Sequence, residues 1–159
     1  MSVRMRTIVP VVAMLSISAV LLAADNPFAG TWKVNFAKTK STRQGPPPRS
    51  RTIKYDPYGA DGIKSTMITV DAQGKSSHEE YAAKFDGKDY EITGDDPRQI
   101  VLKRIDTNTF EAAYKRRGAN TSNARFVVSK DGKTLTIRTS GTAGNGERYS
   151  NDMRVYDKQ

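Results

Sequence analysis

The sequence contains no cysteine and only one histidine, His78, and these two shortages exclude several kinds of chemistry. Without cysteine the chain can form no disulfide and no thiolate zinc site, and it has no thiol for lipid attachment. One imidazole does not make a zinc site by itself. Its neighbours Glu79 and Glu80 point to opposite faces of an extended strand, so they are a poor acid and base pair. We therefore expect no metal and no cofactor.

Catalytic signatures are also scarce. No nucleophile elbow is present, and the glycine-rich run at residues 141–146 joins two expected strands, whereas a phosphate-binding loop needs a helix after it. His78 could serve as a general base or a haem ligand, but we favour a strand residue that faces solvent. Asp95 and Asp96 precede Pro97 in an expected turn, where aspartate is common for backbone hydrogen bonding. The sequence predicts that this chain is not an enzyme.

The N-terminus has the three parts of a secretory signal peptide. Arg4 and Arg6 precede an apolar run at residues 7–22, which ends in the small residues Ala23 and Ala24. A membrane anchor is the alternative, but the run is shorter than the ~20 apolar residues that span a bilayer, and it contains Pro10. We expect cleavage after residues 1–24, a mature chain of residues 25–159, and a periplasmic or secreted location.

The charge of the chain is strongly positive, with 26 Lys and Arg against 17 Asp and Glu. Loss of Arg4 and Arg6 with the signal leaves 24 against 17, a net charge of +7. Because an exported protein rarely meets nucleic acid, we expect none as a partner and consider anionic membrane surfaces, glycans or acidic small molecules. The alternative is that the charge only maintains solubility. Basic residues gather around a proline-rich stretch and at a later turn (Lys38, Lys40, Arg43, Arg49 and Arg51; Lys115, Arg116 and Arg117).

After residue 25 no stretch keeps a helical period, and short β-branched and aromatic segments alternate with turn residues. About ten strands are expected, at residues 31–36, 51–55, 63–70, 76–85, 90–93, 99–105, 109–115, 124–129, 134–139 and 148–156. Three consecutive prolines at residues 46–48 make residues 37–50 an extended loop. Since the other links are short, sequence neighbours should pair, and closure would remove the open edges. We predict one all-β domain at residues 25–159, an antiparallel up-and-down β-barrel of eight to ten strands.

The two ends of this expected domain resemble the calycin barrels. Residues 28–33, Phe-Ala-Gly-Thr-Trp-Lys, resemble the first strand of the lipocalins and, more closely, of the fatty-acid-binding proteins. The Arg154-Val155-Tyr156 end resembles the last strand of the latter, whose Arg and Tyr hold a ligand carboxylate inside the barrel. The resemblance implies a ligand-binding role for Arg154 and Tyr156, with Arg125 as a second arginine. Gly30 and Trp32 would be structural, with Trp32 as a plug at a closed end of the barrel.

The alternation of the last strand gives a different interpretation. Tyr149, Met153 and Val155 share one face of a regular strand, and the simplest pattern puts Met153 and Val155 inside and Arg154 and Tyr156 in solvent. The mature chain is also similar to a widespread set of small exported bacterial proteins with no established activity. The leading hypothesis is an exported barrel that binds a small apolar or lipid-like anionic ligand. The alternative is an envelope interaction protein without a cavity, whose basic loops bind an anionic surface.

Overall fold

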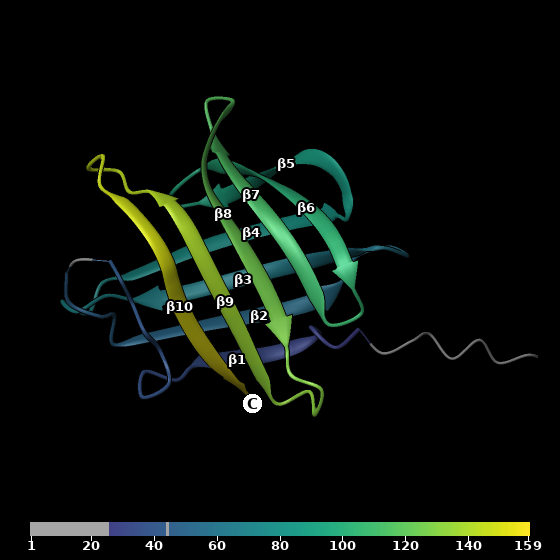
Figure 1. The fold of residues 1–159 in the computed structure, drawn as a ribbon, viewed down its shortest axis with the longest axis horizontal. Coiled ribbons are helices and arrows are strands. Elements are labelled where there is room, and N and C mark those ends of the chain that lie inside the picture. Colours follow the sequence, from purple (N-terminus) through teal and green to yellow (C-terminus); the bar gives the residue numbers. More distant parts are fainter. Residues whose placement is uncertain (1–25, 44) are drawn as a thin grey trace, which may run out of the picture.

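The computed structural model describes residues 26–43 and 45–159, and they form a closed, all-antiparallel β-barrel (Figure 1). The predicted signal peptide, residues 1–24, lies outside these residues. Within the described part of the chain, no helix has the length and apolar character needed to cross a membrane. The strands are β1 (Gly30–Val34), β2 (Ser50–Pro57), β3 (Gly62–Val70), β4 (Ser76–Lys84), β5 (Asp86–Gly94), β6 (Arg98–Asp106), β7 (Thr109–Arg116), β8 (Ala119–Val128), β9 (Thr134–Thr142) and β10 (Arg148–Lys158).

Closure comes from β1, which pairs with β2 on one side and with β10 on the other. Trp32 lies opposite Lys158 and Ile53, so the first strand joins the last strand to the second. Every other strand pairs with its neighbours in sequence, which gives the order β1-β10-β9-β8-β7-β6-β5-β4-β3-β2 around the barrel. The predicted up-and-down barrel of eight to ten strands is confirmed, with ten strands. Closure leaves no free sheet edge, as the short links between strands suggested.

Two strands begin four or five residues earlier than their local residues predict. β5 begins at Asp86 rather than at residue 90, and β8 begins at Ala119 rather than at residue 124. Both extensions lie beside register shifts, and both contain residues of low strand propensity. Pairing with β6 and with β7 holds these segments in the ladder, because strand formation depends more on neighbours than on intrinsic preference.

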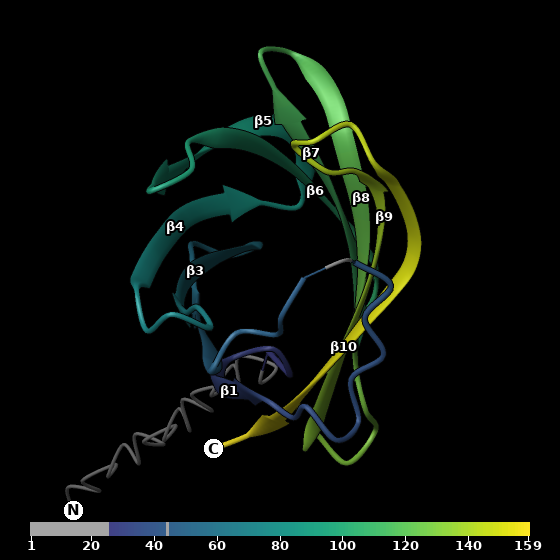
Figure 2. The same ribbon diagram turned by 90° about the vertical axis from the view of Figure 1, so that its left-hand side faces the viewer.

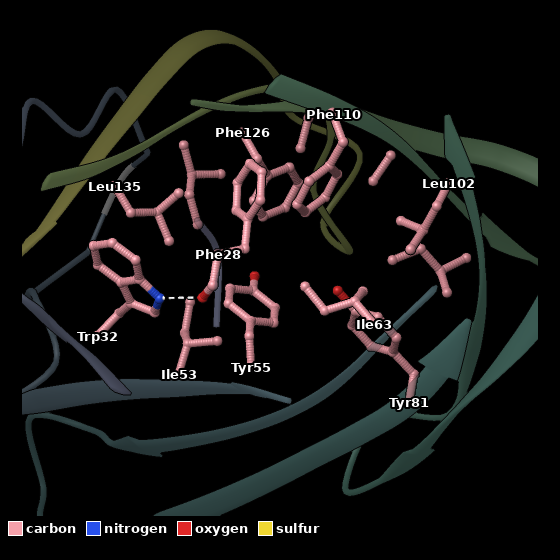
Figure 3. Packing of buried hydrophobic residues seen from close by; sticks show 14 of the residues in the cluster. Phe28, Trp32, Ile53, Tyr55, Ile63, Tyr81, Leu102, Phe110, Phe126 and Leu135 are labelled. Carbon is pink, nitrogen blue, oxygen red and sulfur yellow. Dashed lines mark hydrogen bonds between the residues drawn. The ribbon is translucent and has the colours of Figure 1, made fainter. Parts of the chain in front are cut away.

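One end of the barrel is filled by side chains, and we call it the packed end. Trp32 and Phe28 are fully buried there, and the indole Nε1 of Trp32 donates a 2.7 Å hydrogen bond to the carbonyl oxygen of Phe28 (Figure 3). The ring of Phe110 lies 4.7 Å from that of Phe28 and 4.3 Å from that of Phe126. Buried side chains from opposite walls meet in this cluster, as Figure 3 shows, and those of Phe28, Trp32 and Phe110 fill the packed end.

Gly30 and Trp32 both lie at the packed end. Lys158 covers them: its Nζ is 5.2 Å from the centre of the Trp32 ring, and its Cε would be 3.0 Å from a Cβ on Gly30. Gly30 also has a φ of +118°, which disfavours any other residue. The large ring of Trp32 therefore fills the packed end, with a lysine as its cationic partner.

The other end of the barrel is crossed by a segment that we call the strap, residues 35–43 and 45–49. β1 has only five residues and pairs with the C-terminal end of β10 alone. The preceding part of β10 pairs with the strap, where Lys40 and Met153 exchange backbone hydrogen bonds of 2.8 and 3.0 Å. Asp157 accepts hydrogen bonds from Asn35 Nδ2 and Lys38 Nζ at 2.6 and 3.0 Å. In Figure 2 the strap rises beside β10 and returns to β2. Its route leaves space between strap and barrel.

Candidate functional site

Two connected hollows lie at the strap end of the barrel. The inner cavity, about 480 Å³, lies inside the barrel, and the strap groove, about 630 Å³, lies between the strap and the strands beside it. Both volumes are in the range of small-molecule sites. They share five lining residues, Arg43, Arg51, Ala143, Tyr149 and Arg154, so these residues form the passage from one hollow to the other.

A bulge in β10 decides which residues of this strand reach the cavity. Tyr149 pairs with Gly141, and Asp152 pairs with Thr139, so three steps along β10 match two steps along β9. Asn151 lies in this bulge and has a φ of +54°. An additional residue exchanges the two faces of a strand. Asp152, Arg154 and Tyr156 consequently join Tyr149 on the inner face.

This bulge overturns the simple alternation of the last strand. Arg154 and Tyr156 line the inner cavity, and Tyr156 is 1% exposed. Met153 and Val155 face outward, where the strap covers them through the Lys40–Met153 bridge and a hydrogen bond from the Asn35 amide to the Val155 carbonyl. The prediction that Arg154 and Tyr156 point to solvent is therefore wrong, because it assumed an unbroken period of two.

Three arginines come together where β2, β10 and the strap meet, and we call them the arginine wall: Arg43, Arg51 and Arg154. The Nε of Arg51 donates a 3.0 Å hydrogen bond to Thr69 Oγ1, which fixes the side chain along the inner face of β2. The guanidinium of Arg43 lies over the ring of Tyr149, 4.4 Å from its centre. Burial, and after it the charge of Arg51, lowers the pKa of Arg154 from its usual value. Like charges thus face one another across the passage.

Asp152 is the one carboxylate that pairs with this wall among the described residues. It is fully buried, and its Oδ2 lies 2.7 Å from Nη2 of Arg154. That contact is an ion pair without hydrogen-bond alignment, since Oδ2 accepts no hydrogen bond from a described residue. Oδ1 accepts hydrogen bonds from Ser41 Oγ at 2.7 Å and from the Thr42 amide at 3.1 Å. Asp152 therefore fastens the strap to the barrel beside Arg154.

The facing part of the cavity contains two more arginines, Arg98 and Arg116, and nearby carboxylates compensate their charge. Arg98 makes a bidentate contact with Glu79, at 2.7 and 2.9 Å, and its Nη1 also lies 2.8 Å from Asp96. Asp96 in turn accepts a hydrogen bond from Arg116. Burial alone would lower the pKa of Arg98, but the hydrogen bond and charge of Glu79 raise it above its usual value. We call this group the compensated wall.

Between the two walls the lining is apolar and phenolic. The apolar part comprises Ile53, Met67, Ile92, Phe126 and Ile137, and the phenolic part Tyr55, Tyr81, Tyr114 and Tyr156. Burial raises the pKa of Tyr55 and Tyr114 well above the usual value, and it raises the pKa of Tyr81 to about 12. The hydroxyls of Tyr55, Tyr81 and Tyr114 therefore stay protonated at neutral pH and can donate hydrogen bonds to a ligand.

Arg125 does not belong to this site. It lies between the inward-facing Ala124 and Phe126 on β8, so its side chain points outward, where its Nη1 contacts Glu111 Oε1 at 2.7 Å. The interior position that the resemblance implied for Arg125 is wrong, because β8 keeps regular alternation at this point. His78 also lies outside the cavity lining, with about half of its side chain exposed.

Sequence reasoning missed most of the charged lining. Arg51 could have been found, because it shares the face of Ile53 and Tyr55 in a strand of regular alternation. Arg98 could have been found in the same way, because it shares the face of Ile100 and Leu102 in β6. Arg43 and Asp152 carry no such signal, since a loop places the first and a bulge the second. Among the residues that the structure describes, no group of three or more His, Asp or Glu could hold a metal ion. No protein-family model and no curated protein sequence matches the chain.

Proposed function

We propose that this chain is an exported, non-enzymatic, calycin-like binding protein that holds a small amphiphilic anion in the inner cavity. The observation that carries the proposal is a cavity of about 480 Å³ with the arginine wall on one side and apolar side chains beside it. An anionic head group would lie against Arg51, Arg154 and Tyr156. The apolar part of the ligand would cover Ile53 and Met67. Buried apolar area would provide affinity, and the charged hydrogen bonds would orient the ligand.

The alternative, an envelope protein that binds an anionic surface through basic loops, has less support. Lys115 and Arg116 contact Asp89 and Asp96, so part of the basic turn is already neutralised. In the strap, Lys38 is paired with Asp157, and Arg43 lines the passage to the cavity. These contacts direct basic side chains toward acidic partners and the cavity rather than toward an external surface.

Displacement of a fluorescent amphiphile tests the proposal. The mature protein is titrated with anilinonaphthalene sulfonate, and octanoate is then added below its micellar concentration. We expect saturable binding of one probe per chain and competitive displacement by octanoate. Trp32 fluorescence is a poor reporter, because Trp32 lines neither hollow.

Arg51→Gln and Arg125→Gln form a matched pair of variants for this assay. Arg51 has no carboxylate partner among the described residues, so its replacement leaves no buried carboxylate unpaired. Arg51→Gln should weaken octanoate binding about tenfold, whereas Arg125→Gln, on the outer face, should bind like the wild type. Equal affinity in all three proteins would contradict the proposed site, and no displacement at all would contradict the proposed function.

A further inference from the structure

The two walls of the inner cavity have the same kinds of side chain but different net charges. In the compensated wall, Arg98 and Arg116 face Glu79 and Asp96, and the four formal charges cancel. In the arginine wall, three guanidinium groups face the single carboxylate of Asp152, which leaves a formal charge of +2. A bound anion is therefore drawn to one wall, and the ligand has a fixed direction in the cavity.

Asp152 cannot neutralise the rest of the arginine wall. Its Oδ1 is occupied by Ser41 and Thr42, and its Oδ2 faces Arg154, so the carboxylate is held on one guanidinium. Glu147 lines the strap groove but makes no ion pair with the three arginines. Within the described chain, Arg43 and Arg51 have no carboxylate within 4 Å. Two positive charges thus remain for a ligand at the passage.

We propose that the arginine wall selects a dianionic, phosphomonoester-class head group over a monoanionic carboxylate or sulfate. This inference rests on the proposed function and specifies its ligand. A phosphate monoester near pH 8 carries close to two negative charges and has three acceptor oxygens, which match the uncompensated charge and the donors of several guanidinium groups. The Tyr156 hydroxyl, in the lining beside this wall, adds a hydrogen-bond donor. The apolar side chains between the two walls, such as Ile53 and Met67, would hold the organic part of the ligand.

Three ligands with the same tail separate the effect of charge from the effect of apolar burial. Octyl phosphate, octyl sulfate and octanoate are titrated into the mature protein at pH 8, below their micellar concentrations, by isothermal titration calorimetry. Octyl sulfate is the closest control, because it has the tetrahedral shape of the phosphate with one charge fewer. We expect octyl phosphate to bind at least tenfold more tightly than octyl sulfate and octanoate.

The same variants locate the preference. Arg51→Gln should reduce the preference for phosphate over sulfate to less than about threefold, and Arg125→Gln should keep the full preference. Inorganic phosphate forms a separate arm of the experiment. Much weaker binding of inorganic phosphate than of octyl phosphate supports a lipid-like source, whereas equal binding supports a free phosphate source of the same dianionic class.

The outcomes also distinguish the two proposals. If the octyl ligands bind but octyl phosphate binds less than tenfold more tightly than octyl sulfate or octanoate, the dianion proposal is overturned while the proposed binding function stands. If octanoate or octyl sulfate binds most tightly, the dianion proposal is overturned in the same way. If none of the octyl ligands and no inorganic phosphate binds, the proposed function fails and the dianion proposal fails with it.

Discussion

Replacement of Asp152 by alanine tests the link between strap and barrel. The substitution removes two hydrogen bonds to a charged acceptor, from Ser41 and the Thr42 amide, and the ion pair with Arg154. Each such hydrogen bond contributes about 1.5–3 kcal/mol, but the two donors regain water when the strap separates from the barrel. Loss of one partner of a buried ion pair costs about 3–5 kcal/mol, and this figure is smaller here because Arg154 is 21% exposed. We expect Asp152→Ala to lower the free energy of unfolding by about 2–4 kcal/mol.

Asp152→Asn separates the two contributions. The amide oxygen can still accept hydrogen bonds from the strap, but the negative charge beside Arg154 is lost. We expect a smaller loss of about 1–2 kcal/mol, because the interaction with the strap persists. Urea unfolding followed by circular dichroism measures all the variants, with Asp56→Ala as the control. Asp56 contacts Lys54 at the surface with 44% of its side chain exposed, so its loss should change stability by less than about 0.5 kcal/mol.

The order of the three variants decides the outcome. The contacts of Asp152 require that Asp152→Ala be the least stable, Asp152→Asn intermediate and Asp56→Ala nearly unchanged. An Asp152→Ala protein within 0.5 kcal/mol of the wild type would refute the argument that this carboxylate holds the strap. Equal losses for Asp152→Ala and Asp152→Asn would show that the ion pair with Arg154 accounts for the whole effect.

Three further predictions concern the barrel. Trp32→Phe should lower the free energy of unfolding by about 1–3 kcal/mol, measured by urea unfolding, and leave ligand affinity unchanged, because it removes a buried hydrogen bond away from the cavity. Gly94→Ala should lower the free energy of unfolding by more than about 2 kcal/mol in the same assay, because its φ is +116° and a Cβ would clash with the backbone carbonyl oxygen of His78. Gly132→Ala is the control: it has open space around it, and it should lower the free energy of unfolding by about 1 kcal/mol. Hydrogen bonds from Asn35 and then Lys38 lower the pKa of Asp157, so the folded state binds fewer protons than the unfolded state. Its stabilising effect is present above about pH 4 and is lost as the pH falls further, so thermal melts from pH 6 to pH 2 should show a weaker dependence on pH in Asp157→Asn.

The strands and their order could be predicted from local residues. Alternation in segments such as residues 31–36 and 63–70, with turn residues between them, indicates ten antiparallel strands and short links. Closure then follows because a long meander would otherwise keep two free edges. The cavity lining was harder to predict. Arg51 shares a face with Ile53 and Tyr55 in a regular strand, and Arg98 shares a face with Ile100 and Leu102 in the same way. The ion pair of Arg98 with Glu79 could not be predicted, because it depends on the register of the strands between them.

The sequence by itself determined an all-β barrel, an extended proline-rich loop after the first strand, and the meeting of the first strand with the last. Only the tertiary structure decided which side chains of β10 face inward, because the bulge at Asn151 belongs to the ladder with β9 and reverses a period of two. It also placed Arg125 outside and held Asp152 between the strap and Arg154. Alternation is local and can be read along one strand, whereas register, bulges and charge pairing arise between strands and require the closed barrel.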